Sequence, residues 1–173
     1  MLNLYITQGA VLLLAVIIIL FQGGRFADKF IVQDWPPVIG WGLAFAAVVV
    51  VVDVLISGWV PEDVTDDGGI NELLFRSRPL WQIALLSLVV AVCEELLFRG
   101  AIQAAWGPYW TSIFFAAIHF RYLRHWLMTG MVFCISYGLG WIYIHTGTLW
   151  TAILAHFAID FVMGCIIRYR RES

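Results

Sequence analysis

Charged residues are scarce in this chain of 173 residues: only 13% are Asp, Glu, Lys or Arg, whereas soluble domains carry about 25%. The 10 Lys and Arg residues are outnumbered by 12 Asp and Glu residues, which gives a net charge of −2. The chain therefore lacks a basic face that could neutralise a run of phosphates. These shortages argue against a soluble cytosolic enzyme, a disordered tail and a protein that binds nucleic acid.

Cysteine is also rare. The three cysteines, Cys93, Cys134 and Cys165, each lie inside an apolar run, and the sequence contains no CxxC pair. An odd number of cysteines without a pairing motif predicts neither a disulfide framework nor a cysteine metal site. We expect three small, buried thiols.

Apolar sequence is abundant. Apolar residues make up 62% of the chain and aromatic residues 16%, and the mean hydropathy is +0.87. A membrane-spanning helix needs ~20 mostly apolar residues, so the sequence predicts an all-α fold, a polytopic membrane helical bundle of about six transmembrane helices. The candidate spans are residues 2–21, residues 38–59, a span from Leu80 through Cys93, a short span from Pro108, residues 127–144 and residues 149–167.

The flanks of these spans predict an orientation. No basic residue precedes Arg25, so the first span lacks the basic region of a signal peptide and is expected to be retained. Lys and Arg gather in cytoplasmic loops, and six spans put both termini on one side. We therefore expect a multi-pass membrane protein with both termini cytoplasmic. The opposite side receives only Arg25 and Lys29, and the cytoplasmic side receives Arg76, Arg78, Arg121, Arg124, Arg168, Arg170 and Arg171.

The stretch Glu94-Glu95-Leu96-Leu97-Phe98-Arg99 carries charge where the spans are otherwise apolar. Ionisable groups at membrane depth are costly, which makes them functional hypotheses by default. Glu95 and Arg99 are spaced to pair on one helix face, whereas Glu94 is rotated by about 100° and is free to point elsewhere. Two adjacent carboxylates disfavour ionisation of both, which suits one of them to act as a general base. The alternative is a charge cluster at a helix end, in contact with headgroups.

Two further motifs place ionisable groups in spans. His119 follows the apolar run that begins at Phe115, and His156 and Asp160 are spaced to share one face of the last span. An Asp can fix the tautomer of such a His. The alternatives are a core histidine with satisfied hydrogen bonds and a polar pair that holds helices together. We expect Asp53, which follows five valines, to reach headgroup water.

A depth argument brings these motifs together. If the third helix continues to Trp106 and turns at Gly107-Pro108, Glu95 and His119 both lie roughly 16–18 Å from that turn. His156 and Asp160 lie roughly 12 and 18 Å from Thr148 on the same side. The side chains of Glu94, His119, His156 and Asp160 can therefore share one layer of the bundle. We also expect close packing of the fifth helix at its small residues Gly130, Gly138 and Gly140.

These three motifs, in this order, resemble the CPBP family of CaaX proteases and bacteriocin-processing enzymes, whose pattern is EExxxR, FxxxH and HxxxN or HxxxD. The sequence has Glu94-Glu95-x-x-x-Arg99, Phe115-x-x-x-His119 and His156-x-x-x-Asp160, and the resemblance covers roughly residues 80–165. It implies a polytopic intramembrane endopeptidase. Eukaryotic relatives remove the last three residues of prenylated CaaX proteins, and bacterial relatives are linked to bacteriocin maturation and self-immunity. The resemblance therefore also implies a location in a bacterial cell membrane.

The resemblance also implies roles for individual residues. Glu94 with His119 would activate the attacking water, and His156 with Asp160 would support the oxyanion. Glu95 and Arg99 would hold the geometry of the site. Asp160 stands where some members have Asn, and an ionised carboxylate cannot donate to an oxyanion, so Asp160 would instead orient His156.

The resemblance leaves the cofactor open. Zinc is possible, with Glu94, His119 and His156 as its ligands, but the glutamate mechanism needs the same residues, and we favour the metal-free form. The expected partners are the lipid bilayer and a membrane protein or a lipidated or hydrophobic peptide as substrate.

The resemblance divides the chain into three parts. Residues 1–79 would hold two transmembrane helices and a polar loop, which carries Asp63, Asp66 and Asp67. Residues 80–168 would form the catalytic helical core, and residues 169–173 a short basic cytoplasmic tail.

Three other functions stay open on the sequence. The main alternative is a non-enzymatic membrane protein that serves bacteriocin self-immunity or that binds a membrane partner. A small transporter or proton relay would also carry intramembrane Glu, His and Asp, although no internal halves are visible. A cysteine nucleophile at Cys93, beside Glu94, is the last.

Overall fold

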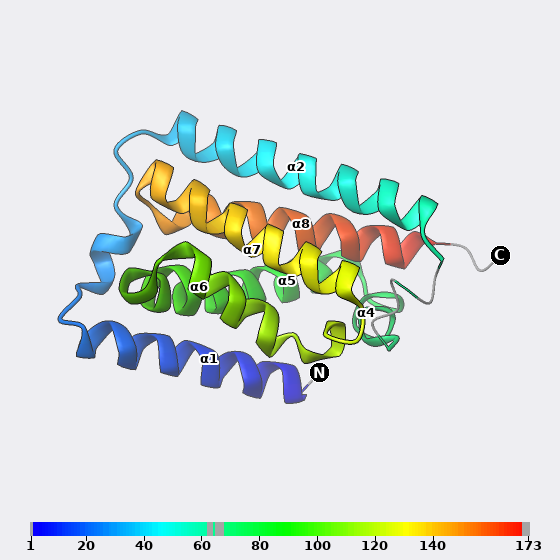
Figure 1. Cartoon of the computed structure of the whole chain (residues 1–173), viewed down its shortest axis with the longest axis horizontal. Coiled ribbons are helices and arrows are strands. Elements are labelled where there is room, and N and C mark those ends of the chain that lie inside the picture. Colours follow the sequence, from blue (N-terminus) through cyan, green and yellow to red (C-terminus); the bar gives the residue numbers. More distant parts are fainter. Residues whose placement is uncertain (1, 62–63, 65–67, 171–173) are drawn as a thin grey trace.

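The structure is a computed structural model that describes residues 2–61, 64 and 68–170, and those residues contain helices but no strands. Figure 1 shows them as a bundle of long helices with short connections. In chain order the elements are α1 (Leu2–Phe21), η1 (Phe26–Phe30), α2 (Trp35–Trp59), α4 (Ile70–Phe75), α5 (Leu80–Glu95), the π-helical segment η2 (Leu96–Ile102), α6 (Gln103–Ile118), η3 (Phe120–Tyr122), α7 (Trp126–Thr146) and α8 (Leu149–Tyr169).

The all-α polytopic bundle is confirmed, and the protein is an integral membrane protein. Five described helical stretches are long and apolar enough to cross a membrane: Leu2–Phe21, Trp35–Trp59, Leu80–Ile118, Trp126–Thr146 and Leu149–Tyr169. Large apolar side chains are exposed along α1 and α2, as lipid-facing surfaces require. Asp63, Asp66 and Asp67 of the polar loop lie outside the described residues, as do Arg171 and the rest of the chain end.

The count is five rather than about six because the third and fourth predicted spans form one helical stretch. The chain reverses inside it at Gly107, whose φ of 72° and ψ of 171° are not helical. Glycine adopts a positive φ without steric cost, and Pro108 suits the first turn of the helix that follows. The returning limb, residues 108–118, is far shorter than the ~20 residues of a full span. His119 is therefore held inside the bundle rather than at its far surface.

The other helix boundaries also follow from local sequence. Pro36 and Pro37 stand in the first turn of α2, where a missing N–H costs nothing. Gly147 ends α7 in the left-handed conformation, with φ of 70°, and Thr148 begins α8 directly after it. This short turn makes α7 and α8 antiparallel neighbours.

Helix α8 lies at the centre of the packing. It contacts α2, α5 and α7, while α1 packs on α5 and η2. In Figure 1, α1 and α2 lie on opposite sides of the bundle with the other long helices between them. The side chain of Arg168, near the end of α8, donates to the carbonyl oxygen of Arg78, just before α5. This contact joins two of the basic segments at one end of the bundle; the cytoplasmic location of that end stays a prediction.

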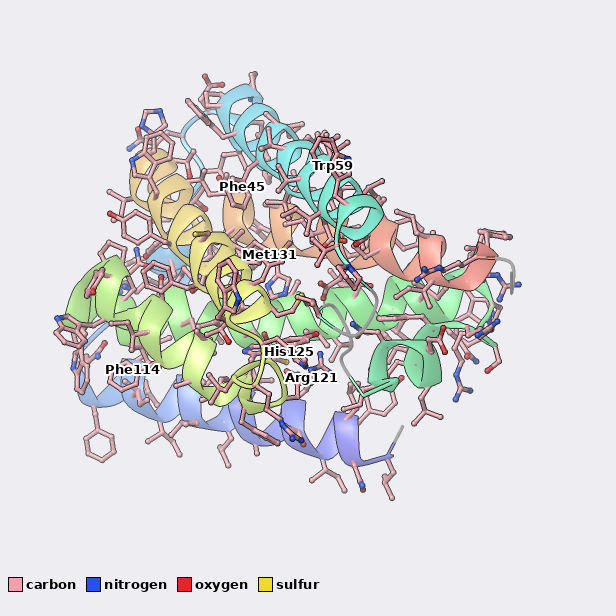
Figure 2. The ribbon with its side chains drawn as sticks, turned by 45° about the vertical axis from the view of Figure 1, so that its right-hand side comes forward. Phe45, Trp59, Phe114, Arg121, His125 and Met131 are labelled. Carbon is pink, nitrogen blue, oxygen red and sulfur yellow. The ribbon has the colours of Figure 1, made fainter. Side chains whose placement is uncertain are left out.

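Two of the three predicted close-packing glycines of α7 are confirmed. A Cβ at Gly138 would lie 2.3 Å from the Cε2 of Phe45, a residue that Figure 2 places between α2 and α7. A Cβ at Gly140 would lie 2.6 Å from Gln103 Oε1 and 3.2 Å from Pro108 Cβ. The prediction for Gly130 is wrong, because a Cβ there would meet nothing within 4 Å.

We expect Gly140→Ala to destabilise the bundle and Gly130→Ala to leave it unchanged or slightly stabilised. At Gly140 the added methyl would push Gln103, whose Nε2 donates to the Gly140 carbonyl at 3.0 Å. Overpacking of this kind costs about 1–3 kcal/mol, whereas Ala in an open helical position gains roughly 0.5–1 kcal/mol over Gly. Thermal unfolding of both purified variants in the same detergent measures the difference; equal melting temperatures would contradict the close approach at Gly140.

Candidate active site

A cavity of about 510 Å³ lies inside the bundle and brings together four of the predicted site residues. Glu94 near the end of α5, His119 directly after α6, and His156 and Asp160 on α8 all line it. Figure 2 places Arg121 and His125 where α6 leads into α7, with Met131 further along α7; Arg121 and Met131 also line the cavity. Residues far apart in the sequence thus face one cavity, as the depth argument expects.

Glu95 and Arg99 form an ion pair behind this cavity. Arg99 Nη1 lies 3.0 Å from Glu95 Oε1, and both side chains are 0% exposed. Arg99 Nη2 donates to the carbonyl oxygen of Ser136 on α7 at 2.8 Å and to its Oγ at 3.1 Å. The guanidinium also lies 5.2 Å from the centre of the Phe115 ring. One arginine therefore joins η2 to α6 and α7.

The two adjacent glutamates have different surroundings. Glu95 is buried against Arg99, whereas Glu94 lines the cavity and accepts a hydrogen bond from Gln8 Nε2 of α1 at 3.2 Å. The π-helical segment η2 begins directly after Glu95. Such segments are rare and are frequent at functional sites. Glu94 is thus the carboxylate of the pair that a bound molecule can reach.

His156 lies between two carboxylates. Its Nδ1 is 2.7 Å from Glu95 Oε1, and its Nε2 is 3.5 Å from Asp160 Oδ2. An ionised carboxylate only accepts hydrogen bonds, so Nδ1 carries a proton and donates it to Glu95. Glu95 Oε1 therefore accepts from both Arg99 and His156, and the ion pair orients the imidazole that faces the cavity.

His119 is oriented by the backbone. Its Nδ1 lies 2.7 Å from the Phe115 carbonyl oxygen, which can only accept, so Nδ1 is the protonated nitrogen. In the neutral ring Nε2 then holds the lone pair. The ring lies 4.5 Å from the Phe115 ring and stacks on Tyr122 at 6.2 Å with an interplanar angle of 8°. The Phe and His of the second motif thus meet through both the backbone and the rings.

Sequence reasoning missed two cavity residues on the first two helices. Gln8 of α1 is only 6% exposed and contacts Glu94. Asp53 of α2 was expected at headgroup water, but it is half-buried and lines the cavity. The sequence did carry a signal for Gln8, namely a glutamine inside the apolar span 2–21. Polar groups at membrane depth are functional hypotheses by default.

The donors of the site do not form a metal-binding group. Within the ranges that the structure describes, no three His, Cys, Asp or Glu side chains are placed to hold one ion. Nδ1 of His119 and Nδ1 of His156 are already bonded to Phe115 and Glu95. The predicted zinc ligands Glu94, His119 and His156 line one cavity, but they do not form a three-ligand set.

Cys93 is the residue before Glu94, yet it is buried and is not among the described residues that line the cavity. Of the other two cysteines, Cys165 is half-buried and Cys134 is exposed. The expectation of three buried thiols is therefore right for Cys93 alone. The placement of Cys93 gives a cysteine nucleophile no access to a substrate in the cavity.

Comparison with known proteins covers the stretch that carries the three motifs. Residues 72–162 match the family model described as "Type II CAAX prenyl endopeptidase Rce1-like". A protein of Bacillus subtilis (strain 168), named "Uncharacterized protein YpbD", is 43% identical over 132 residues, which cover 76% of this chain and 70% of that relative. No solved structure matches the chain.

We expect Glu95→Gln to lower the free energy of unfolding by about 3–5 kcal/mol, because it leaves the Arg99 charge buried without its partner. The matched control is Glu72→Gln, which removes an exposed pair of the same spacing: Glu72 and Arg76 lie 3.2 Å apart. Exposed pairs contribute about 0–1 kcal/mol. Unfolding of both variants in lipid nanodiscs measures the difference, and Glu95→Gln combined with Arg99→Met should recover part of the loss. An equal, small effect of both single variants would contradict the structural role of the buried pair.

Proposed function

Since the chain belongs to the Rce1-like type II CAAX prenyl endopeptidase family, a family of membrane proteases, we propose that it hydrolyses peptide bonds of membrane-associated substrates in the Glu94 cavity. The observation that carries the proposal is the shared cavity: Glu94, His119, His156 and Asp160 face one space of about 510 Å³ between apolar helices. Paired ionisable groups in a poorly hydrated pocket are typical of catalytic sites.

Glu94 is the proposed general base. Its neighbour Glu95 neutralises Arg99, whereas Glu94 faces the cavity and keeps its capacity to accept a proton. Glu94 takes one proton from a water molecule whose oxygen attacks the scissile carbonyl carbon, and Nε2 of neutral His119 accepts the water's second hydrogen bond. When the C–N bond breaks, Glu94 returns its proton to the leaving amine.

His156 is the proposed oxyanion donor. Its Nδ1–H is held by Glu95 at 2.7 Å, and the carboxylate of Asp160 lies 3.5 Å from its Nε2. In its doubly protonated form this ring presents an Nε2–H to the oxygen of the tetrahedral intermediate. Asp160 then contributes charge and orientation to His156 rather than a hydrogen bond of its own to that oxygen.

The cavity wall supports an apolar substrate. Besides the catalytic groups the wall carries a few charged side chains, such as Asp53, Arg121 and Arg170, and a larger apolar part that includes Met128, Met131 and Met163. Methionine is flexible and polarisable, so it fits apolar partners of different shape. We therefore propose a membrane protein or a lipidated or hydrophobic peptide as the substrate.

We expect Glu94→Gln to abolish cleavage while the protein still folds and inserts, because the amide cannot take a proton from water. Loss of a general base costs about 10²- to 10⁴-fold in rate. Membrane peptidomics of cells with the wild-type chain or the variant, at matched expression, measures it: fragments present only with the wild type identify the substrate and its cut site. Cys93→Ala is the control and should give the wild-type fragments.

Two results would contradict this proposal. Equal fragment yields from Glu94→Gln and the wild type would exclude Glu94 as the base. The alternative, a non-enzymatic immunity or partner-binding protein, would be favoured by a second result. In that result the wild-type protein is stably inserted, but its cells and the Glu94→Gln cells have identical peptidomes without specific fragments.

We expect cleavage by the purified protein to continue in the presence of a zinc chelator, because the proposed steps use only Glu94, His119, His156 and water. Catalytic zinc needs three protein ligands besides its water, and the described donors form no such group. The measurement is the rate of cleavage of a peptide that carries the identified cut site, with and without chelator, alongside the zinc content of the preparation. Inhibition that added zinc reverses would show that the enzyme depends on the metal.

A further inference from the structure

Helix α1 contributes a buried amide to the candidate base. Gln8 is 6% exposed, and its Nε2 lies 3.2 Å from Glu94 Oε1. Gln8 also lines the cavity. It lies far outside residues 72–162, the stretch that matches the family model, so its contact with Glu94 comes from the tertiary structure of this chain.

The chemistry of the pair decides how the amide is oriented. A carboxylate accepts hydrogen bonds, so the NH₂ group of Gln8 must face Glu94 and its carbonyl oxygen must point away. That oxygen, Oε1, is buried and has no hydrogen-bond partner among the residues that the structure describes. A buried acceptor without a partner is costly, so the chain keeps a glutamine here at an expense that an apolar side chain would not carry.

Anchoring of α1 does not account for this glutamine. The helix is already held by Ala15 and Ile19, which are fully buried against residues of α5 and η2. A leucine at position 8 would pack on the same surface without a buried unpaired oxygen. The polar side chain is therefore explained better by what it does to Glu94 than by helix packing.

We propose that Gln8 is a positioning residue for Glu94. Its N–H holds the Glu94 carboxylate towards the cavity, where the carboxylate can meet the attacking water. This inference rests on the proposed role of Glu94 as the base. It makes α1 part of the site rather than a membrane anchor alone.

The inference predicts a loss of turnover rather than of substrate binding. A group that only holds the general base in place acts on the chemical step, so its loss lowers kcat and leaves KM nearly unchanged. The neighbours of Glu94 that line the cavity, among them His119, His156 and Asp160, are not altered in a Gln8 variant. A fall in kcat at constant KM therefore reports the missing amide.

Three variants of the full-length protein in lipid nanodiscs test the proposal. Gln8→Leu removes the amide, Gln8→Glu keeps its size and an acceptor oxygen but has no N–H, and Thr7→Val is the matched control. Thr7 is the preceding residue of α1 and is exposed, and its hydroxyl donates to the Asn3 carbonyl oxygen of its own helix. Cleavage of a peptide that carries the identified cut site gives kcat and KM for each variant, and thermal unfolding gives its stability.

We expect kcat to fall about 10- to 100-fold in Gln8→Leu and Gln8→Glu, in line with the loss of a hydrogen bond to a charged group, while KM stays close to that of the wild type. Thr7→Val should match the wild type in both constants.

An unchanged kcat in Gln8→Leu and Gln8→Glu would overturn the positioning role. A rise in KM at unchanged kcat would make Gln8 a substrate-binding residue instead, and a fall in kcat matched by a lower melting temperature would make it a structural residue only. If instead Glu94→Gln still yields the wild-type fragments, the proposed function fails first, independently of Gln8.

Discussion

The bundle depends on one buried charge network, in which Glu95 Oε1 accepts hydrogen bonds from both Arg99 and His156. Arg99 extends the network to the backbone of Ser136. Charges buried at this depth are tolerated only when they are paired and hydrogen-bonded. The network thus constrains α5, η2, α7 and α8 to one arrangement. It also orients the ring of His156, which faces the cavity.

This arrangement gives two neighbouring carboxylates opposite tasks. Glu95 is fully buried and neutralises Arg99, whereas Glu94 lies on the cavity wall and accepts a hydrogen bond from the uncharged amide of Gln8. A carboxylate committed to an arginine is a poor base, so the division leaves Glu94 for chemistry. The same helix therefore supplies a structural and a reactive group at consecutive positions.

The reversal at Gly107 determines where His119 of the second motif lies. Because the chain turns there, the short limb 108–118 ends within the bundle, and His119 follows it at the level of Glu94. The tight turn at Gly147 does the same for α8, which returns beside α7 and brings His156 and Asp160 to the cavity. Two glycines with positive φ thus align side chains from separate helices.

The sequence by itself determined the all-α class, the limits of the long helices and the i,i+4 pairs of Glu95 with Arg99 and His156 with Asp160, because apolar run length and helical spacing are local properties. It also located the turn at Gly107. Only the tertiary structure decided that Gly130 is open and that Gln8 and Asp53 reach the cavity. These facts depend on which helix faces which, and a uniformly apolar helix such as α1 or α2 carries almost no pattern from which its inward face can be read.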